Sequence, residues 1–154
     1  MLFTLKEVLE LCEAKNCAVG SFNTPNLESV MAVIGAAEEL DVPVIIQHAE
    51  VHEEIMPLSV IGPVMLEMAK SAKVPVVVHI DHGETVEYIN RALNMGFTSV
   101  MYDGSVLSFA ENVANTKLVV ALAKRVGASV EAEIGCMGKR ETGSGSAGNG
   151  NDPE

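Results

Sequence analysis

Residues 75–84 read Pro-Val-Val-Val-His-Ile-Asp-His-Gly-Glu, and this stretch says more about the fold than any other part of the chain. Its β-branched run, Val76 to Val78, predicts a buried strand. The strand ends in three polar residues: His79, Asp81 and His82. Two imidazoles and a carboxylate are costly to bury without partners, so this strand end predicts a metal-binding or proton-transfer site.

The rest of the chain alternates short apolar strands with amphipathic helices. Thr4 and Glu7 form a capping-box signature that opens the first helix. The predicted helices are 4–14, 26–40, 57–73, 84–95 and 109–126, and the predicted strands are 17–22, 43–47, 74–80, 98–102 and 128–134. On the second helix one face is expected to be buried: Leu27, Val30, Ile34 and Ala37. A βα repeat of this kind predicts parallel strands covered by helices.

Five βα units leave two architectures open. A barrel of eight units uses about 250 residues, so a chain of 154 residues holds roughly five of them. That length suits an open doubly wound sheet and equally suits the first part of a barrel. Residues 142–151 are rich in Gly and Ser, which predicts a flexible loop. Asp152-Pro153 then resembles the start of another helix, which favours a barrel that continues beyond residue 154.

Polar side chains gather at the carboxyl ends of the predicted strands, the edge where parallel α/β folds bind ligands. They are Asn23, Gln47, His48, Asp81, His82, Asp103, Glu131 and Glu133. Glu131 and Glu133 are two positions apart, so we expect them on one face of a strand, where a cation would relieve their repulsion. Asp103 precedes Gly104 and could equally cap a helix or form a turn. His48 and His52 are expected to be polar loop residues. Histidine with carboxylates and without paired cysteines suits a catalytic divalent metal.

Composition narrows the class of protein. The net charge of −11 argues against nucleic acid, whose binding relies on basic patches, and against anionic membranes. No apolar run approaches the roughly 18 residues needed to span a bilayer. Three cysteines, Cys12, Cys17 and Cys136, are too few and too irregular for a disulfide framework, so we expect a cytoplasmic protein. A small phosphorylated substrate is compatible with the charge, because backbone amides or a bound cation supply local positive potential.

Taken together, the motifs resemble the N-terminal part of the class II, metal-dependent ketose-bisphosphate aldolase family, of the fructose- and tagatose-bisphosphate type. The resemblance covers residues 1 to about 141 and rests on these stretches: Ser21-Phe22-Asn23, Asn26-Leu27-Glu28, Pro43-Val44-Ile45-Ile46, His79-Ile80-Asp81-His82-Gly83, Tyr102-Asp103-Gly104-Ser105, Glu111-Asn112-Val113 and Val130-Glu131-Ala132-Glu133-Ile134-Gly135. It implies a TIM barrel of which about the first five βα units are present, so that residues 1–154 form one partial barrel domain.

The resemblance also implies an activity: reversible aldol cleavage of a ketose bisphosphate to dihydroxyacetone phosphate and an aldehyde. Asp81 matches the carboxylate that exchanges a proton with the C4 hydroxyl of the substrate. Glu141 falls where relatives place a glutamate proposed to move the C3 proton, and Asn23 where relatives contact substrate or order the metal shell. Many relatives carry a serine where this chain has Ala49, so a sugar other than fructose 1,6-bisphosphate is compatible.

The cofactor implied by the resemblance is Zn²⁺, a Lewis acid that stabilises the enediolate. His82 matches the first zinc ligand, and Asp103 and Glu133 match carboxylates that hold a second or alternative metal position, so a second divalent or monovalent cation is implied as well. The family's other two zinc histidines and its phosphate loops lie on strands beyond position 154. For these 154 residues alone we therefore expect weak metal affinity and little or no activity. Relatives imply a homodimer or homotetramer.

Three alternatives compete with metal-dependent cleavage. A Schiff-base mechanism is disfavoured because none of the lysines ends a predicted strand: Lys6, Lys15, Lys70, Lys73, Lys117, Lys124 and Lys139. A non-catalytic half-barrel could associate with itself or a partner chain through its unpaired edge strands. A doubly wound receiver or nucleotide-binding domain has the right length, but residues 21–25 lack the Gly-rich phosphate loop expected there.

Overall fold

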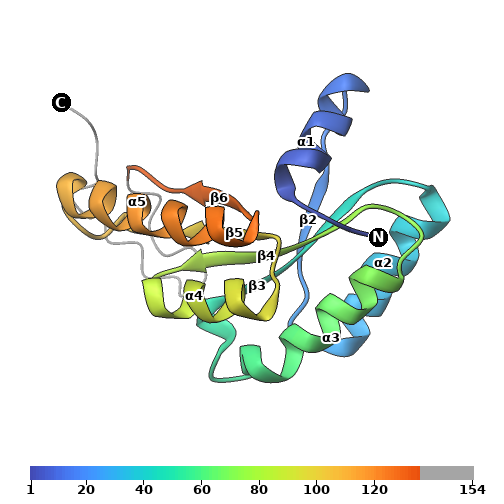
Figure 1. The fold of residues 1–154 in the computed structure, drawn as a ribbon. Helices are drawn as coiled ribbons and strands as arrows, with labels where there is room; N and C mark the ends of the chain where they lie inside the picture. Colours follow the sequence, from blue (N-terminus) through green and yellow to red (C-terminus); the bar gives the residue numbers. More distant parts are fainter. Residues whose placement is uncertain (136–154) are drawn as a thin grey trace.

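The computed structural model describes residues 1–135, which form one parallel β-sheet with its connecting helices (Figure 1). The strands are β1 Leu2–Phe3, β2 Gly20–Asn23, β3 Val44–Ala49, β4 Val76–Gly83, β5 Ser99–Tyr102 and β6 Ser129–Ala132. The helices are α1 Leu5–Ala14, α2 Leu27–Leu40, α3 Leu58–Ser71, α4 Val86–Met95 and α5 Phe109–Val126, with a 3-10 turn, η1, at Glu50–His52. Every predicted helix and strand is present within this part of the chain.

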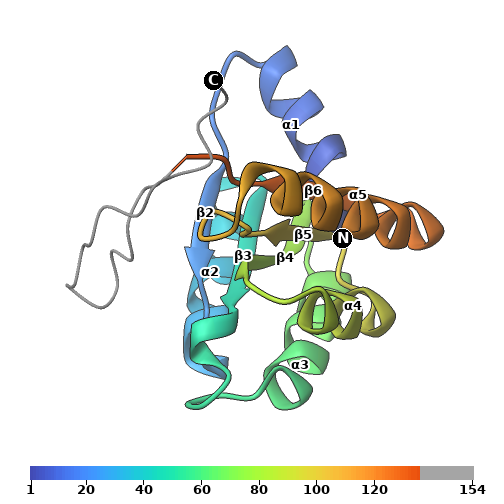
Figure 2. The ribbon, with the colours of Figure 1, turned by 90° about the vertical axis from the view of Figure 1, so that its left-hand side faces the viewer.

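The strands follow their order along the chain, β2-β3-β4-β5-β6, and each neighbouring pair is parallel (Figure 2). The short β1 pairs with the beginning of β4, Leu2 against Val76. Because βα crossovers are right-handed, a sequential strand order puts every crossover helix on the same face of the sheet. A doubly wound sheet reverses its order and carries helices on both faces, so this topology is that of a barrel wall.

The two faces of the sheet have different cores. Alternate residues of the strands, such as Ile46, Val78 and Val100, pack with buried residues of α2, α3, α4 and α5 in one large cluster. The intervening residues point to the opposite, inner face, where Ile45 and Val77 pack with Val8 and Cys12 of α1. In Figure 1, α1 accordingly lies across β3 and β4 from α2 and α3. The inner face beyond α1 is where polar strand residues can meet.

Local signals set the ends of the helices, and the capping box of α1 is the one predicted from the sequence. The Thr4 side chain accepts a hydrogen bond from the Glu7 N–H, and the Glu7 carboxylate accepts one from the Thr4 N–H at 2.8 Å, which completes the capping box of α1. Asn26 caps α2 in the same way together with Ser29. Gly96 and Gly127 end α4 and α5 in the left-handed conformation.

Some predicted boundaries are wrong. The first long strand begins at Gly20 rather than Cys17, because the Cys17 N–H donates to the Cys12 carbonyl at 3.0 Å and is part of the turn that ends α1. Leu27 is 47% exposed and does not share the buried face of its helix. The strand predicted at 74–80 runs from Val76 through Gly83. Residues 2–3 were not expected to form a strand, because two residues carry no periodicity.

Some predictions concern residues that the structure does not describe. Glu141, the Gly/Ser-rich loop at 142–151 and the helix start at Asp152-Pro153 lie outside the described residues. Within residues 1–135, no helix has the length and apolar character required to cross a membrane.

Candidate active site

The end of β4 has an unusual backbone that sets the direction of its polar side chains. His82 has φ 44°, a left-handed conformation that costs a non-glycine residue roughly 1–3 kcal/mol. The next position must be glycine, because a Cβ on Gly83 would lie 2.8 Å from Cγ1 of Ile89 and 2.9 Å from the carbonyl oxygen of Met101. The β4–β5 pairing shifts register between Ile80 and Gly83, in line with this turn. Strain at this point is typical of a functional site.

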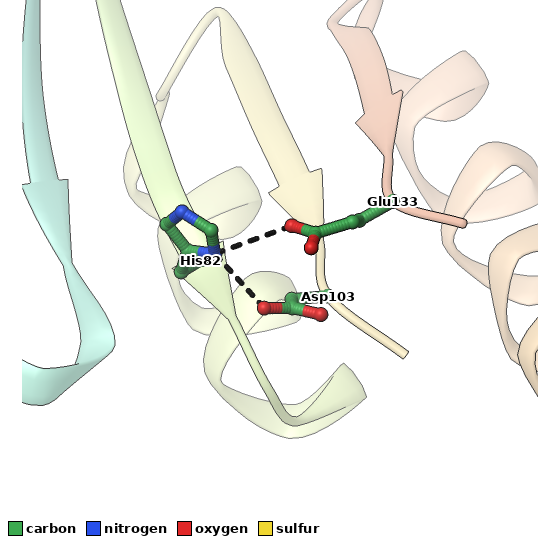
Figure 3. A group of neighbouring side chains, drawn as sticks. All are labelled: His82, Asp103 and Glu133. Atoms are coloured by element: carbon green, nitrogen blue, oxygen red, sulfur yellow. Dashed lines mark hydrogen bonds and ion pairs between the residues drawn. The ribbon is translucent and has the colours of Figure 1, made fainter. Parts of the chain in front are cut away.

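His82 meets two carboxylates that come from the ends of the next two strands (Figure 3). Its Nδ1 lies 2.8 Å from Oδ2 of Asp103, just after β5, and 3.6 Å from Oε2 of Glu133, just after β6. One ligand atom from each of the three residues lies within 4.8 Å of the other two. The family resemblance implied a metal-binding role for all three, and the fold brings them together.

The electrostatics of this group favour a positive charge. Partial burial lowers the pKa of His82, but the hydrogen bond with Asp103 and the nearby carboxylates raise it more, so it lies above its usual value. Burial raises the pKa of Glu133, and the charge of Asp103 raises it further. An imidazole nitrogen and two carboxylates, held close enough for the carboxylates to repel each other, fit a divalent cation.

Asp103 both forms a turn and faces the metal group, which are the two kinds of role that the sequence left open. Its Oδ1 accepts a hydrogen bond from the Ser105 N–H at 3.0 Å, which forms a turn before α5. Its Oδ2 faces His82. Burial raises its pKa, but the hydrogen bonds from Ser105 and His82 lower it more, so the carboxylate has a pKa below its ordinary value. The turn therefore fixes Oδ1 of Asp103 and leaves Oδ2 on the side of His82, where it can bind a metal ion.

A cleft of about 580 Å³ opens on the inner face of the sheet beside this group. The polar residues that line it are Ser21, Gln47, His79, Asp81 and Glu131. Asp81 is half-buried, and its Oδ2 accepts a hydrogen bond from Nδ2 of Asn23 at 3.3 Å. Ser21 donates a hydrogen bond to Oε1 of Gln47. The predicted catalytic Asp81 and substrate-binding Asn23 thus contact each other at one end of the cleft.

His79 lies two residues before Asp81 in β4, on the same inner face of the sheet. Its contacts were not predicted. Its Nδ1 lies 2.8 Å from Oγ of Ser99, and its Nε2 lies 3.6 Å from a carboxylate oxygen of Glu131. Burial lowers the pKa of His79 to about 4, against the opposing charge of Asp81. Glu131 and Glu133 face β4 together as expected, although β6 already ends at Ala132. The contact of His79 with Glu131 could have been anticipated, because His79 lies two positions before Asp81 and alternate residues of a strand share one face.

The structure places His48 differently from the prediction. It is not a loop residue: it lies in β3 and is 0% exposed. Position 48 alternates with the cleft-lining Gln47, so the ring points to the opposite face, under the outer helices. His52, which lies in η1, has its ring 5.7 Å from that of His48. His48 therefore lies outside the candidate site.

The lysines of the described residues lie in or beside helices, as predicted. They are Lys6, Lys15, Lys70, Lys73, Lys117 and Lys124. In residues 1–135 no lysine is on a strand that lines the cleft.

Comparison with known proteins gives the family. A family model described as class-II fructose-bisphosphate aldolase matches residues 3–153. The chain is 44% identical over 135 residues to the fructose-bisphosphate aldolase of Thermus caldophilus, a match that covers 88% of this chain and 44% of that protein. It is 40% identical over 147 residues to the 6-phospho-5-dehydro-2-deoxy-D-gluconate aldolase of Halalkalibacterium halodurans, covering 92% of this chain and 50% of that protein.

The crystal structure of the YdjI aldolase from Escherichia coli K12 has the same arrangement, with a TM-score of 0.81 and 36% identity over 86% of this chain and 52% of that one. This likeness confirms the predicted partial (β/α) barrel. The chain spans about half the length of the curated relatives it matches. Since the family model covers nearly all of its residues, the chain belongs to the class II fructose-bisphosphate aldolase family.

Proposed function

We propose that the protein containing this chain catalyses metal-dependent, reversible aldol cleavage of a ketose bisphosphate to dihydroxyacetone phosphate and an aldehyde. The observation that carries the proposal is the group His82, Asp103 and Glu133 at the carboxyl edge of the sheet, next to the cleft that holds Asp81. Ligand sites of parallel barrels lie at this edge. The names of the relatives support the same reaction class.

In this proposal, His82, Asp103 and Glu133 hold the metal, with Zn²⁺ as the principal ion. Asp103 and Glu133 also offer a second or alternative position for a divalent or monovalent cation. When bound, the ion supplies a Lewis acid that polarises a substrate oxygen. Asp81 accepts the proton of the C4 hydroxyl during cleavage and returns it during condensation. Asn23 orients the Asp81 carboxylate through their 3.3 Å hydrogen bond. Glu141 moves the C3 proton.

The proposed substrate class follows from the family and from one residue, Ala49, that differs from the serine of many relatives. Fructose or tagatose 1,6-bisphosphate is the proposed type of substrate. Ala49 is 1% exposed and pairs in register with Asp81, so its methyl group offers no hydrogen bond where relatives carry a serine hydroxyl. A sugar other than fructose 1,6-bisphosphate is thus compatible with this position. We place the enzyme in the cytoplasm as a homodimer or homotetramer, in line with its few cysteines and its family.

A chelator tests the metal requirement. Protein expressed from the complete gene should cleave fructose or tagatose 1,6-bisphosphate in a coupled assay for dihydroxyacetone phosphate. Dialysis against EDTA should abolish turnover and added Zn²⁺ should restore it, because the ion supplies the Lewis acid. Turnover that survives complete metal removal would contradict the proposal.

Replacing Asp81 tests the proton transfer. Asp81→Asn keeps the size of the side chain and removes the base, so kcat should fall by about 100- to 10,000-fold while Zn²⁺ affinity stays near that of the wild type. Asp41→Asn is the matched control, since Asp41 is exposed at the left-handed C-cap of α2. Equal activity of the two variants would remove Asp81 from the mechanism.

A further inference from the structure

A buried asparagine of α5 lies behind the metal group. Asn112, in the first turn of α5, is 2% exposed. Its Nδ2 donates a hydrogen bond to the backbone carbonyl of Glu133 at 2.8 Å. Its Oδ1 accepts one from Oγ1 of Thr116, one turn further along the helix, at 3.2 Å. A buried amide of this kind needs such partners, and here one of them is the backbone of a proposed metal ligand.

The same amide also lies against the residue that follows Asp103. A Cβ on Gly104 would come 2.4 Å from Oδ1 of Asn112 and 2.7 Å from its Cγ. Only glycine lets the chain after β5 approach Asn112 this closely. The side chain therefore contacts the backbone at Glu133 and the backbone one residue after Asp103.

The sheet itself holds the Glu133 backbone by a long hydrogen bond. The pairing of β6 with β5 ends at Ala132 and Tyr102, one residue before Glu133. The Glu133 N–H reaches the Tyr102 carbonyl only at 3.4 Å, at the long end for a hydrogen bond. Its bond from Asn112 is shorter by 0.6 Å. Past the end of the sheet, α5 thus supplies the firmer attachment.

We propose that Asn112 is a positioning residue that sets the separation of the Asp103 and Glu133 carboxylates and thereby the affinity of the site for its metal. This inference rests on the proposed metal site. Partners behind metal ligands fix their orientation, and their loss typically weakens metal binding by 10- to 100-fold. Asn112 acts on two ligands at once because its amide contacts the backbone at Glu133 and at Gly104, the residue after Asp103.

The test compares two asparagines of one helix in the protein expressed from its complete gene. Asn112→Ala removes both contacts, and Zn²⁺ affinity, measured by competition with a chromophoric chelator, should fall about 10- to 100-fold. Asn115→Ala is the matched control: its Nδ2 donates at 2.8 Å to the side-chain hydroxyl of Tyr102 rather than to the backbone at Glu133. Asn115→Ala should keep wild-type affinity within about twofold. Melting temperatures of both variants report any general loss of stability.

Thr116→Val provides a second, milder test that does not depend on Asn112→Ala folding. It removes the donor to Oδ1 of Asn112 and leaves the asparagine in place. Zn²⁺ affinity should fall in the same direction by a smaller factor, and kcat should fall with little change in KM once metal is limiting. Unchanged affinity in Thr116→Val and in a folded Asn112→Ala would overturn the inference.

The outcomes also separate this inference from the proposed function. A wild-type protein that binds Zn²⁺ through this site but does not cleave a ketose bisphosphate contradicts the function and leaves the role of Asn112 standing. An active wild-type enzyme whose Asn112→Ala and Asn115→Ala variants bind Zn²⁺ equally contradicts the role of Asn112 alone. A wild-type protein that binds no Zn²⁺ overturns both.

Discussion

At the scale of single residues, His48 contributes to the response of the protein to acid. It is fully buried, and among the described residues neither ring nitrogen has a hydrogen-bond partner. Burial and the charge of His52 lower its pKa to about 4. Since the unfolded pKa is about 6.5, the stability contributed by neutral His48 is complete above pH 6.5 and is lost as the pH falls toward 4. A leucine at position 48 has no titratable group, so it would remove this part of the pH dependence of stability.

We expect His48→Leu to reduce the loss of unfolding free energy between pH 7 and pH 5 by about 2 kcal/mol, since each pKa unit is worth about 1.4 kcal/mol. At pH 7 the variant should be at least as stable as the wild type, because it removes an unsatisfied buried polar group. Urea unfolding of the metal-free protein at both pH values measures this. Identical pH dependence in the two proteins would show that another group is responsible.

At the scale of elements, the 3-10 turn η1 secures the start of α4. Oε2 of Glu50 accepts hydrogen bonds from the N–H groups of Glu84 at 2.7 Å and Thr85 at 3.2 Å, and its Oε1 accepts one from Oγ1 of Thr85 at 3.0 Å. A carboxylate at a helix N-terminus also interacts favourably with the helix dipole. The loop after β3 is thereby hydrogen-bonded to the loop after β4, at the residues that directly follow His82 and Gly83.

Glu50→Gln should therefore lower the unfolding free energy by about 1–2 kcal/mol, because it replaces charge-assisted hydrogen bonds with neutral ones. Glu54→Gln is the matched control in the same loop, and it should change the free energy by less than about 0.5 kcal/mol because Glu54 is exposed. Denaturant unfolding compares the two. Equal stability of the variants would mean that the Glu50 bonds add nothing net.

At the scale of the whole molecule, the sheet separates a large outer core from a small inner one. Val8 is fully buried in the inner core with Ile45 and Val77, near the beginnings of the strands. Val8→Ala should cost about 1–3 kcal/mol of unfolding free energy, from lost burial and the cavity left behind. Val60→Ala on the exposed side of α3 is the matched control and should be nearly neutral. Both should bind Zn²⁺ as the wild type does, since the metal group is at the other end of the strands. Weaker metal binding in Val8→Ala alone would show that the two ends are coupled.

Much of the fold and site was predictable because it depends on local patterns. The capping pair Thr4–Glu7, the run Val76 to Val78 and the polar strand ends each determine their own neighbourhood. The contacts that involve His48, Asn112 and Glu50 were not predictable, since each joins elements far apart in the sequence. A histidine after Gln47 looks like a loop residue until the strand continues to Ala49 and the outer helices cover it.

The sequence by itself determined the βα alternation, the helix ends and the residues available for chemistry, because hydrophobic period and capping act within a few positions. It also carried the family resemblance, through the order of its motifs. The βα alternation left a doubly wound sheet and a barrel wall open; the family resemblance implied the barrel, and the tertiary structure confirmed it. That choice depends on strand order and on which face the crossover helices cover, and no local pattern encodes either. The tertiary structure likewise brought His82, Asp103 and Glu133 within 4.8 Å of one another, since parallel strands align their carboxyl ends regardless of their separation along the chain.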